Sequence, residues 1–419
     1  MFQSFGDIPK EKSIDNSIAL LKEGYRFIPN RCRQYGTDIF QTRLLGEKVL
    51  CMSGEKAAEI FYDKEKFHRK GAAPKRIQKT LFGENAIQSM DGNSHEHRKL
   101  LFMSLMTPDK LERLSQITNV LWREKTRDWQ GADKVVLFEE TKQLLCKAAC
   151  KWAGVPLQEE EVKQRADDFW KMVDAFGAVG PRHWQGRSAR KRGEKWIQSV
   201  IEQIRAGKLD VNEGTAAYAM AFHRDIAGKQ MDSHMAAVEL INVLRPIVAI
   251  TDYIAFSVVA LTDHPEYQEK IKNADDEFYQ WFVQEVRRYY PFGPFLGARV
   301  RRSFIWNEVK FHEGTLVLMD VYGTNHDSRL WENPEKFHPE RFKEWTGGMF
   351  DLIPQGGGDY YKNHRCPGEW ITIQVMKDSL GFLVNKVNFE LPEQDLNYSL
   401  VRMPSLPQSG VILTNISSA

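Results

Sequence analysis

One stretch limits what this chain can fold into more than any other: a glycine-rich loop that ends in a cysteine. The loop, QGGGDYYKNHRCPGE, covers residues 355–369 and contains Cys366. Apolar residues at helical spacing follow directly, over residues 370–380. Backbone N–H groups and the helix dipole stabilise a thiolate in this position, so we expect a lowered thiol pKa. His364 and Arg365 add positive charge beside it.

Two interpretations of Cys366 follow from this setting. In the first, it is a small buried cysteine at the start of a helix. In the second, it is a thiolate that serves as the axial ligand of a haem iron. The loop alone does not decide between them.

Composition limits the class of protein. The chain has 419 residues, of which 42% are hydrophobic and 27% are charged, as in ordinary soluble globular proteins. A net charge of +2 argues against nucleic acid as the main partner. The odd number of cysteines, five, favours a reducing compartment over a disulfide framework. Cys146 and Cys150 lie four residues apart on a helical pattern without further ligands at zinc spacing, so we expect them in the core.

Targeting and membrane signals are weak. The N-terminal residues contain charges and a proline and no apolar core of a secretory signal. The most apolar stretch, residues 235–261, is interrupted by Glu239, Arg245 and Asp252. No uncharged run therefore reaches the length of a transmembrane helix. We predict a soluble, cytoplasmic protein without a transmembrane segment.

Helical periodicity dominates the chain. Helices are predicted over residues 14–25, 54–62, 95–106, 109–128, 137–152, 158–177, 188–206, 233–262, 276–290 and 368–386. Alternating patterns predict a hairpin over 38–53, with its turn at Gly46 and Glu47, and strands within 297–319 and 387–414. No repeat or low-complexity linker divides the chain. We therefore predict one mainly α domain with a few small β-sheets.

Two segments are candidates for a ligand entrance. Residues 181–193 form the most basic run, either a solvated loop and helix start or a collar that attracts anionic ligands. Residues 71–92 mix apolar and polar side chains in a loop-like pattern that suits a lid over a pocket. Within the lid, Phe82 and Gln88 are candidates to face a ligand.

Three short motifs follow one another in the last third of the chain. Glu285 and Arg288 lie on one face of a predicted helix, where they can pair; alone, such a pair is usually exposed. Residues 339–342, Pro-Glu-Arg-Phe, contain Arg341 and are typical of an ordered loop. The third motif is His-x-Cys-x-Gly at residues 364–368.

In this order and spacing, the three motifs resemble those of the cytochrome P-450 family. The resemblance implies a mainly α fold with small β-sheets and a single haem-thiolate domain over residues 1–419. It implies haem b between a long distal helix and the cysteine loop with its proximal helix, with Cys366 as the iron ligand. A buried charge network is expected to hold the cysteine loop, formed by Glu285, Arg288 and Arg341.

The resemblance also assigns further cofactor-binding residues. His364 is expected near a haem propionate. His95 and Lys99 share a helical face and resemble the basic residues that meet a propionate in this family; the alternative is surface charge. The loop departs from the family pattern, because Asp359 replaces the usual aromatic residue seven positions before the cysteine. The loop is longer, and Gln355 lies eleven positions before the cysteine.

The predicted distal helix departs more strongly from the family pattern. Most members carry an acid next to a threonine there, which relays protons to bound dioxygen. This chain has Arg245 and Pro246 at the central position, and Thr251 and Asp252 follow about two turns later. Pro246 cannot donate to the carbonyl of Asn242, so we predict a kink at this point.

Arg245 is then a permanent cation in an apolar stretch. Burying an unpaired guanidinium is costly, so Arg245 needs an anion. One alternative is an internal partner such as Glu239 or Asp252, six and seven residues away. The other is the carboxylate of a bound ligand, which the planar guanidinium binds through two parallel hydrogen bonds.

The Arg–Pro pair resembles that of the bacterial fatty-acid peroxygenases, a branch of the cytochrome P-450 family that uses hydrogen peroxide. The similarity covers nearly the whole chain. It implies hydroxylation of long-chain fatty acids, mainly at Cβ with some at Cα, without a redox partner. The substrate carboxylate, held by Arg245 next to Pro246, is expected to serve as the general acid–base.

The same resemblance implies an apolar channel and one selectivity residue. The fatty-acid tail is expected along Phe82, Val173, Phe176, Phe292 and Phe295. Gln88 aligns with a position that is glutamine or histidine among relatives. Relatives with histidine tend towards decarboxylation to terminal alkenes, so Gln88 favours hydroxylation, with some alkene as a possible side product.

Two other functions fit part of the pattern. The first is a conventional monooxygenase that uses dioxygen and redox partners, against which Arg245 and Pro246 argue. The second is a non-catalytic haem-thiolate carrier or sensor of fatty acids, in which a thiolate ligand has no evident purpose.

Overall fold

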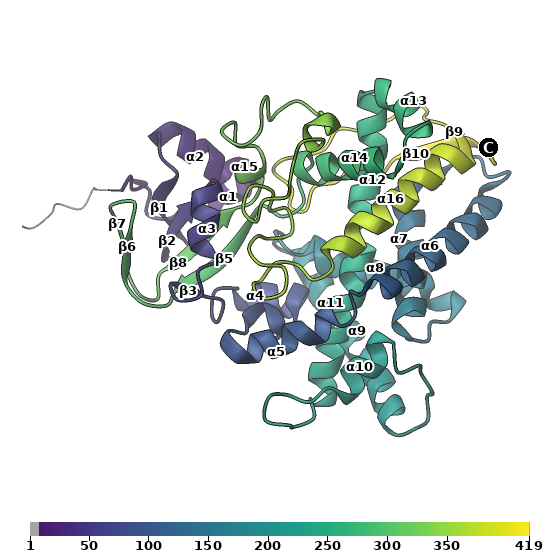
Figure 1. Ribbon diagram of the computed structural model, residues 1–419, viewed down its shortest axis with the longest axis horizontal. Helices are drawn as coiled ribbons and strands as arrows, with labels where there is room; N and C mark the ends of the chain where they lie inside the picture. Colours follow the sequence, from purple (N-terminus) through teal and green to yellow (C-terminus); the bar gives the residue numbers. More distant parts are fainter. Residues whose placement is uncertain (1–7, 419) are drawn as a thin grey trace, which may run out of the picture.

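A long, buried helix runs through the middle of the protein and positions the rest (Figure 1). In the computed structural model, which describes residues 8–418, this helix consists of α11 (Ser233–Ala249) and α12 (Thr251–Asp263), separated at Ile250. It is long and apolar enough to cross a membrane, but 94% of its apolar stretch is buried inside the protein. A helix that is apolar on all sides belongs in a core, and this one is the core helix here.

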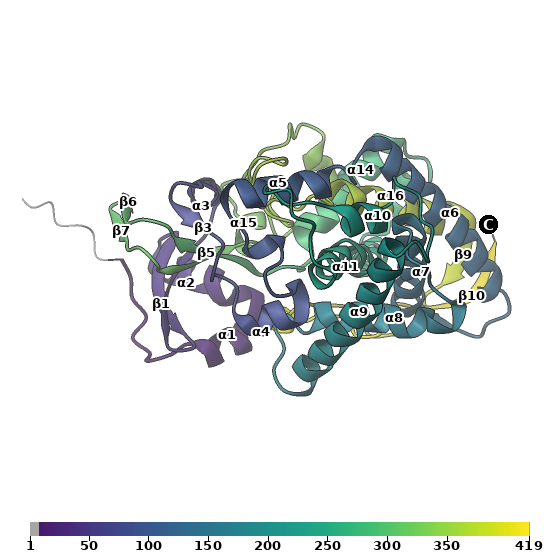
Figure 2. The same ribbon diagram turned by 90° about the horizontal axis from the view of Figure 1, so that it is seen from below.

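Several of the other helices pack around this pair (Figures 1 and 2). Direct neighbours of α11 or α12 include α7, α8, α9, α10, α14 and α16. The bounds are α1 (Ser17–Glu23), α2 (Phe27–Tyr35), α3 (Glu55–Phe61), α4 (Lys75–Ile77), α5 (Gly92–Met103), α6 (Pro108–Trp129), α7 (Leu137–Ala153), α8 (Val162–Asp174), α9 (Pro181–Arg205), α10 (Ala216–Phe222), α13 (Glu266–Lys272), α14 (Asp276–Tyr289), α15 (Tyr322–Asn325) and α16 (Glu369–Lys386).

The strands form three small sheets, and the largest lies at one end of the molecule (Figure 1). In order, it contains β1 (Ile39–Leu44), β2 (Glu47–Met52), β8 (Leu316–Asp320), β5 (Phe295–Val300) and β3 (Phe67–His68), and only β2 and β8 pair in parallel. The second joins β4 (Val135–Val136), β10 (Ile412–Ser418) and β9 (Val387–Glu390), and the third is β6 (Phe304–Trp306) with β7 (Val309–Phe311). The fold is thus mainly α with small sheets, as predicted.

The predicted hairpin over residues 38–53 is confirmed as β1 and β2. Its turn lies one residue earlier than predicted, at Leu45 and Gly46, whose φ angles are 52° and 77°. Two consecutive left-handed residues give the hairpin turn whose twist matches that of the strands.

The largest difference from the sequence prediction concerns the basic run at 181–193. It forms the start of α9, seven residues earlier than predicted. Arg190 within it is only 2% exposed, so the interpretation as a solvated segment is wrong for this residue. Short helices such as α2, α10 and α13 were also not predicted separately.

Cys146 and Cys150 lie in the main hydrophobic cluster with α11 and α12, which confirms their predicted place in the core. Within residues 8–418, no group of three or more His, Cys, Asp or Glu side chains is arranged to hold a metal ion.

Candidate functional site

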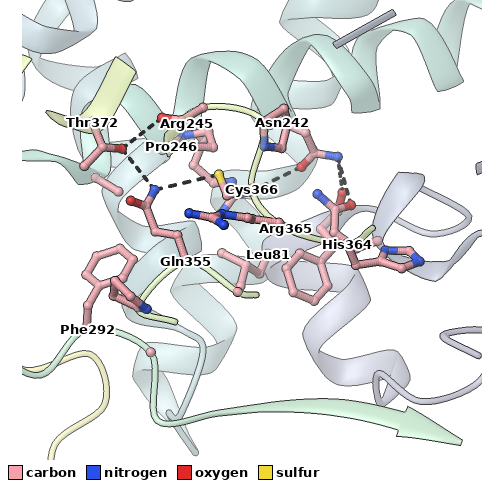
Figure 3. A pocket seen from close by; sticks show the side chains of 18 of the residues that line it. Leu81, Asn242, Arg245, Pro246, Phe292, Gln355, His364, Arg365, Cys366 and Thr372 are labelled. Carbon is pink, nitrogen blue, oxygen red and sulfur yellow. Dashed lines mark hydrogen bonds between the residues drawn. The ribbon is translucent and has the colours of Figure 1, made fainter. Parts of the chain in front are cut away.

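Cys366 faces a cavity of about 340 Å³ between α11 and the start of α16 (Figure 3). Its backbone N–H donates to the carbonyl of Gln355 at 3.0 Å, which closes the loop before α16. Gly356 is needed in this loop, because its φ of 91° is left-handed and a Cβ there would lie 2.9 Å from the hydroxyl of Tyr62. The glycine-rich sequence therefore bends the chain so that the sulfur faces the cavity.

The loop does not by itself make Cys366 a thiolate. Burial raises the pKa of the Cys366 thiol, and this effect outweighs the opposing effects of Lys99 and the Gly368 N–H. The predicted lowering of this pKa is wrong for the polypeptide alone, because desolvation of a buried sulfur exceeds the stabilisation that the helix start supplies. A bound metal cation is the missing charge that would hold the deprotonated sulfur.

One side-chain amide supports the sulfur from the loop. Gln355 Nε2 lies 3.7 Å from Cys366 Sγ and donates to Thr372 Oγ1 at 3.0 Å (Figure 3). Arg287 donates to Gln355 Oε1 at 2.9 Å and pairs with Glu369 at 2.7 Å. Arg287 was not among the predicted site residues, although it directly precedes the Arg288 of the first motif.

Basic side chains gather along one wall of the cavity. The rings of His95 and His364 stack with their centroids 3.8 Å apart, and Lys99 donates to the backbone carbonyl of Arg365. Burial and then Lys99 lower the pKa of His95 to about 4, and burial lowers the pKa of Lys99 to about 8. Burial lowers the pKa of His364 as well, and the next contribution comes from Arg69, which sequence reasoning missed. Burial is the main cause of these lowered pKa values, so a group of desolvated bases lies side by side here, which suits an anionic cofactor.

The predicted charge network behind the cysteine loop is present. Arg288 pairs with both carboxylate oxygens of Glu285 at 2.7 and 2.8 Å, and both side chains are fully buried. Arg341 approaches the same carboxylate at 3.2 Å. Arg288 also donates to the carbonyl of Asn325, whose side chain accepts the N–H of Ile353 just before the loop. The network therefore connects to the segment that positions the loop.

Arg245 and Pro246 line the same cavity as Cys366 (Figure 3). The Arg245 side chain is buried, with 6% of the residue exposed. Its one hydrogen bond is from Nη2 to Asn242 Oδ1 at 3.3 Å, and its Nε has no partner in the described part of the chain. Burial, and then repulsion from Arg190, lower the pKa of Arg245 to about 9.

Neither of the internal anions considered from the sequence pairs with Arg245. Glu239 pairs with Arg98 at 2.7 Å instead. Both carboxylate oxygens of Asp252 are buried without a hydrogen-bond partner among residues 8–418, and burial raises its pKa. Thr251 donates to the carbonyl of Phe138 at 3.1 Å, and neither Thr251 nor Asp252 is among the described residues that line the cavity.

The backbone around Pro246 remains helical. Although Pro246 cannot donate to the carbonyl of Asn242, α11 continues to Ala249. The interruption lies at Ile250, whose N–H donates to the carbonyl of Ile247. The change from α11 to α12 therefore falls four residues after the proline.

Every predicted channel residue lines the cavity: Phe82, Val173, Phe176, Phe292 and Phe295. Gln88 also lines it, and its Oε1 lies 3.5 Å from Asn242 Nδ2. None of the described residues that line the cavity is an aspartate or a glutamate. The cavity thus combines the buried Arg245 guanidinium, an apolar channel and the Cys366 sulfur.

The comparisons with known proteins agree with this geometry. A family model described as "Cytochrome P-450" matches residues 251–414. A solved structure of cytochrome P-450EX alpha (CYP152N1) with myristic acid is 43% identical, with a TM-score of 0.96, over 99% of this chain and all of that one. The chain belongs to the cytochrome P-450 family. More narrowly, it belongs to the CYP152 branch, the peroxygenase subfamily that the Arg–Pro pair indicated.

Two other similar proteins share a smaller part of the sequence with this chain. A structure of a variant of cytochrome P-450 OleT in complex with arachidonic acid is 39% identical over 99% of both chains, with a TM-score of 0.96. A protopanaxadiol 6-hydroxylase from Panax ginseng is 25% identical over 84% of this chain and 79% of its own length.

The cofactor of this cytochrome P-450 is haem b, and the cavity fits it. Cys366 would supply a thiolate ligand to the iron, and the buried bases His95, Lys99 and His364 would bind the carboxylates of the haem. A cavity wall with several buried bases and no acid matches the charge of a dicarboxylate porphyrin.

Proposed function

We propose that this cytochrome P-450 is a peroxygenase that uses hydrogen peroxide to hydroxylate long-chain fatty acids beside the carboxylate, with Cβ favoured over Cα. One observation supports the proposal above all. Arg245 is buried at the cavity without an ion pair, and none of the described lining residues is an acid. A cation that is costly to bury and faces a ligand cavity is best explained by an anionic ligand.

The apolar channel extends this argument from a carboxylate to a fatty acid. Five apolar side chains, four of them phenylalanines, line the same cavity as Arg245: Phe82, Val173, Phe176, Phe292 and Phe295. Binding would bury the alkyl chain against them and pair the carboxylate with the guanidinium. Two solved relatives carry myristic acid and arachidonic acid, which are ligands of this class.

Haem with a thiolate ligand supplies the oxidising chemistry, and the polypeptide supplies position and the route for a proton. Arg245 would hold the substrate carboxylate in the cavity, which leaves Cα and Cβ as the carbons closest to this anchor. Cleavage of hydrogen peroxide requires a proton to move from one of its oxygens to the other. With no acid in the described lining, the substrate carboxylate itself would accept and return this proton.

A conventional oxygen-dependent monooxygenase is the second candidate. It needs a proton relay in the cavity, and Thr251 and Asp252 do not supply one because neither is among the described residues that line it. We therefore also propose that no redox partner is required. A single haem-thiolate domain over residues 1–419 and a cytoplasmic location remain predictions.

The proposal is tested by incubating the holoenzyme with a fatty acid of 14 to 18 carbons, either with hydrogen peroxide or with NADPH, a ferredoxin and its reductase. We expect 3-hydroxy acid as the main product and 2-hydroxy acid as the minor one, with peroxide only. Turnover only with the redox partners would favour the monooxygenase. Stoichiometric binding without consumption of peroxide would favour a carrier.

A further inference from the structure

A chain of buried polar side chains leads away from Arg245 into the protein. Asn242 Oδ1 accepts a hydrogen bond from Arg245, and Asn242 Nδ2 donates to Glu239 Oε2 at 3.1 Å. Glu239 Oε1 in turn accepts from Arg98 Nη1 at 2.7 Å. Glu239 is fully buried on α11, one turn before Asn242. None of these contacts was singled out from the sequence.

The chemistry of these groups determines which way the Asn242 amide points. Its NH₂ group faces two acceptors that cannot donate, the carboxylate of Glu239 and the backbone carbonyl of Phe82 at 2.8 Å. The amide oxygen is therefore left for Arg245, as the 3.3 Å contact shows. Because this is the only hydrogen bond of the Arg245 side chain within the described chain, the orientation of Asn242 determines how the guanidinium is held.

The same carboxylate also holds the lid segment. The backbone N–H of Ile87 donates to Glu239 Oε1 at 3.0 Å. Asn242 Nδ2 contacts the carbonyl of Phe82 and lies 3.5 Å from Gln88 Oε1. Phe82 and Gln88 both line the cavity. Glu239 thus connects Arg245 on α11 to the lid segment, which carries the lining residues Phe82 and Gln88.

We propose that Glu239 is a positioning residue for substrate binding. Its carboxylate orients the Asn242 amide, the amide holds Arg245, and the same carboxylate fixes the lid segment relative to that cation. This inference rests on the proposed function, because it assumes that Arg245 binds the substrate carboxylate.

The test is the substitution Glu239→Gln, which keeps the shape and replaces one acceptor oxygen with a donor. The new NH₂ group would face the NH₂ of Asn242, and two donors cannot pair. Asn242 would then turn its oxygen towards residue 239 and its NH₂ towards Arg245, which would lose its hydrogen bond. A hydrogen bond to a charged group contributes enough for about a tenfold or larger change in affinity.

The measurement compares myristic acid with 1-tetradecanol, which has the same chain and no carboxylate. Dissociation constants are obtained from the change in haem absorbance on titration of the holoenzyme. We expect the wild type to bind the acid more tightly than the alcohol. In Glu239→Gln the preference for the acid should fall about tenfold or more, while the affinity for the alcohol changes little. A loss of folding stability alone would not change this ratio.

Two further variants make the result decisive. If Glu239→Gln folds poorly because Arg98 loses its partner, the double variant with Arg98→Met removes both buried charges and is measured instead. Asp168→Asn is the matched control, since Asp168 is buried and pairs with Arg192 but is not among the described lining residues. It should keep the wild-type ratio.

The outcomes separate the two proposals. An unchanged preference for the acid in a folded, haem-loaded Glu239 variant would overturn the positioning role and leave the proposed function intact. A wild-type enzyme that does not prefer the acid would overturn the role of Arg245, and the positioning role with it. An equal loss in the Asp168 control would show that removal of any buried carboxylate has this effect, and would also overturn the inference.

Discussion

Replacing Arg245 with methionine should make the ligand-free holoenzyme more stable and remove its preference for carboxylates. Arg245 is buried without an ion pair in the described chain, and burial lowers its pKa to about 9. A depressed pKa of a base means that the folded state disfavours the charged form. Below pH 9 the folded and the unfolded chain both carry the charge, so the full cost applies at neutral pH. The cost of burying this charge decreases only as the pH rises above about 9.

The size of both effects can be worked out. A pKa difference of about 3.5 corresponds to roughly 5 kcal/mol as an upper value for the cost of burying this charge. Replacing buried charges with apolar side chains of similar volume typically recovers about 1–4 kcal/mol. For a chain of this length, the usual unfolding entropy per residue gives a rise in Tm of about 1–4 °C. Loss of one partner of a buried charge pair costs about 2–5 kcal/mol of binding, so the affinity for a fatty acid should fall by about 30-fold to 4000-fold.

Thermal unfolding followed by haem absorbance gives Tm, and titration with myristic acid and 1-tetradecanol gives the two affinities. Arg190→Met is the matched control, because Arg190 is equally buried but pairs with Glu194 at 2.6 Å and donates to the carbonyls of Leu81 and Phe82. This control should lower Tm, since it leaves buried acceptors without partners. If Arg245→Met lowered Tm as much as Arg190→Met and kept the preference for the acid, the argument from an uncompensated cation would be refuted.

Three further predictions follow from the same cavity. A short carboxylic acid added with hydrogen peroxide should start oxidation of a substrate that lacks a carboxylate, because the anion supplies the missing acid–base at Arg245; no gain in rate across a series of acids from two to eight carbons would contradict this. Gln88→His should raise the proportion of terminal alkene among the products of a long-chain fatty acid, and an identical product ratio would remove Gln88 from the argument. Above pH 9, the affinity for myristic acid should weaken by up to about tenfold per pH unit as Arg245 loses its proton, while that for 1-tetradecanol stays constant; parallel curves for the two ligands would speak against this assignment.

Much of the fold and of the cavity lining could be predicted from the sequence, because those signals are local. Helical periodicity located α6, α7 and α14 to within a residue or two. The family resemblance implied that Cys366 and Arg245 lie on opposite faces of one haem site, and the structure brings both to one cavity. The structure gives the positions of these residues, and their roles in catalysis remain predictions.

What the sequence did not reveal depends on contacts between distant segments. Arg69 lowers the pKa of His364 although nothing in the sequence around Arg69 marks it. Arg98, on α5, and Glu239 are 141 positions apart in the sequence. Helical spacing suggested Glu239 as a partner of Arg245, but spacing within one helix gives no information about contacts with another helix. The sign of the pKa shift of Cys366 was missed for a related reason, because burial by the whole fold outweighs the local helix dipole.

The absence of an acid from the described cavity lining has a consequence for the lifetime of the enzyme. On the proposed mechanism, peroxide that enters an empty cavity meets no carboxylate among the described lining residues, so oxidant is activated only when a fatty acid brings its own carboxylate and is present to be oxidised. Such an enzyme protects its own haem and side chains from bleaching during periods without substrate. The stability of the enzyme in peroxide should therefore depend on how tightly Arg245 binds its carboxylate ligand. A substitution that introduced a permanent acid beside Arg245 would remove this protection and would allow oxidation of a wider range of molecules.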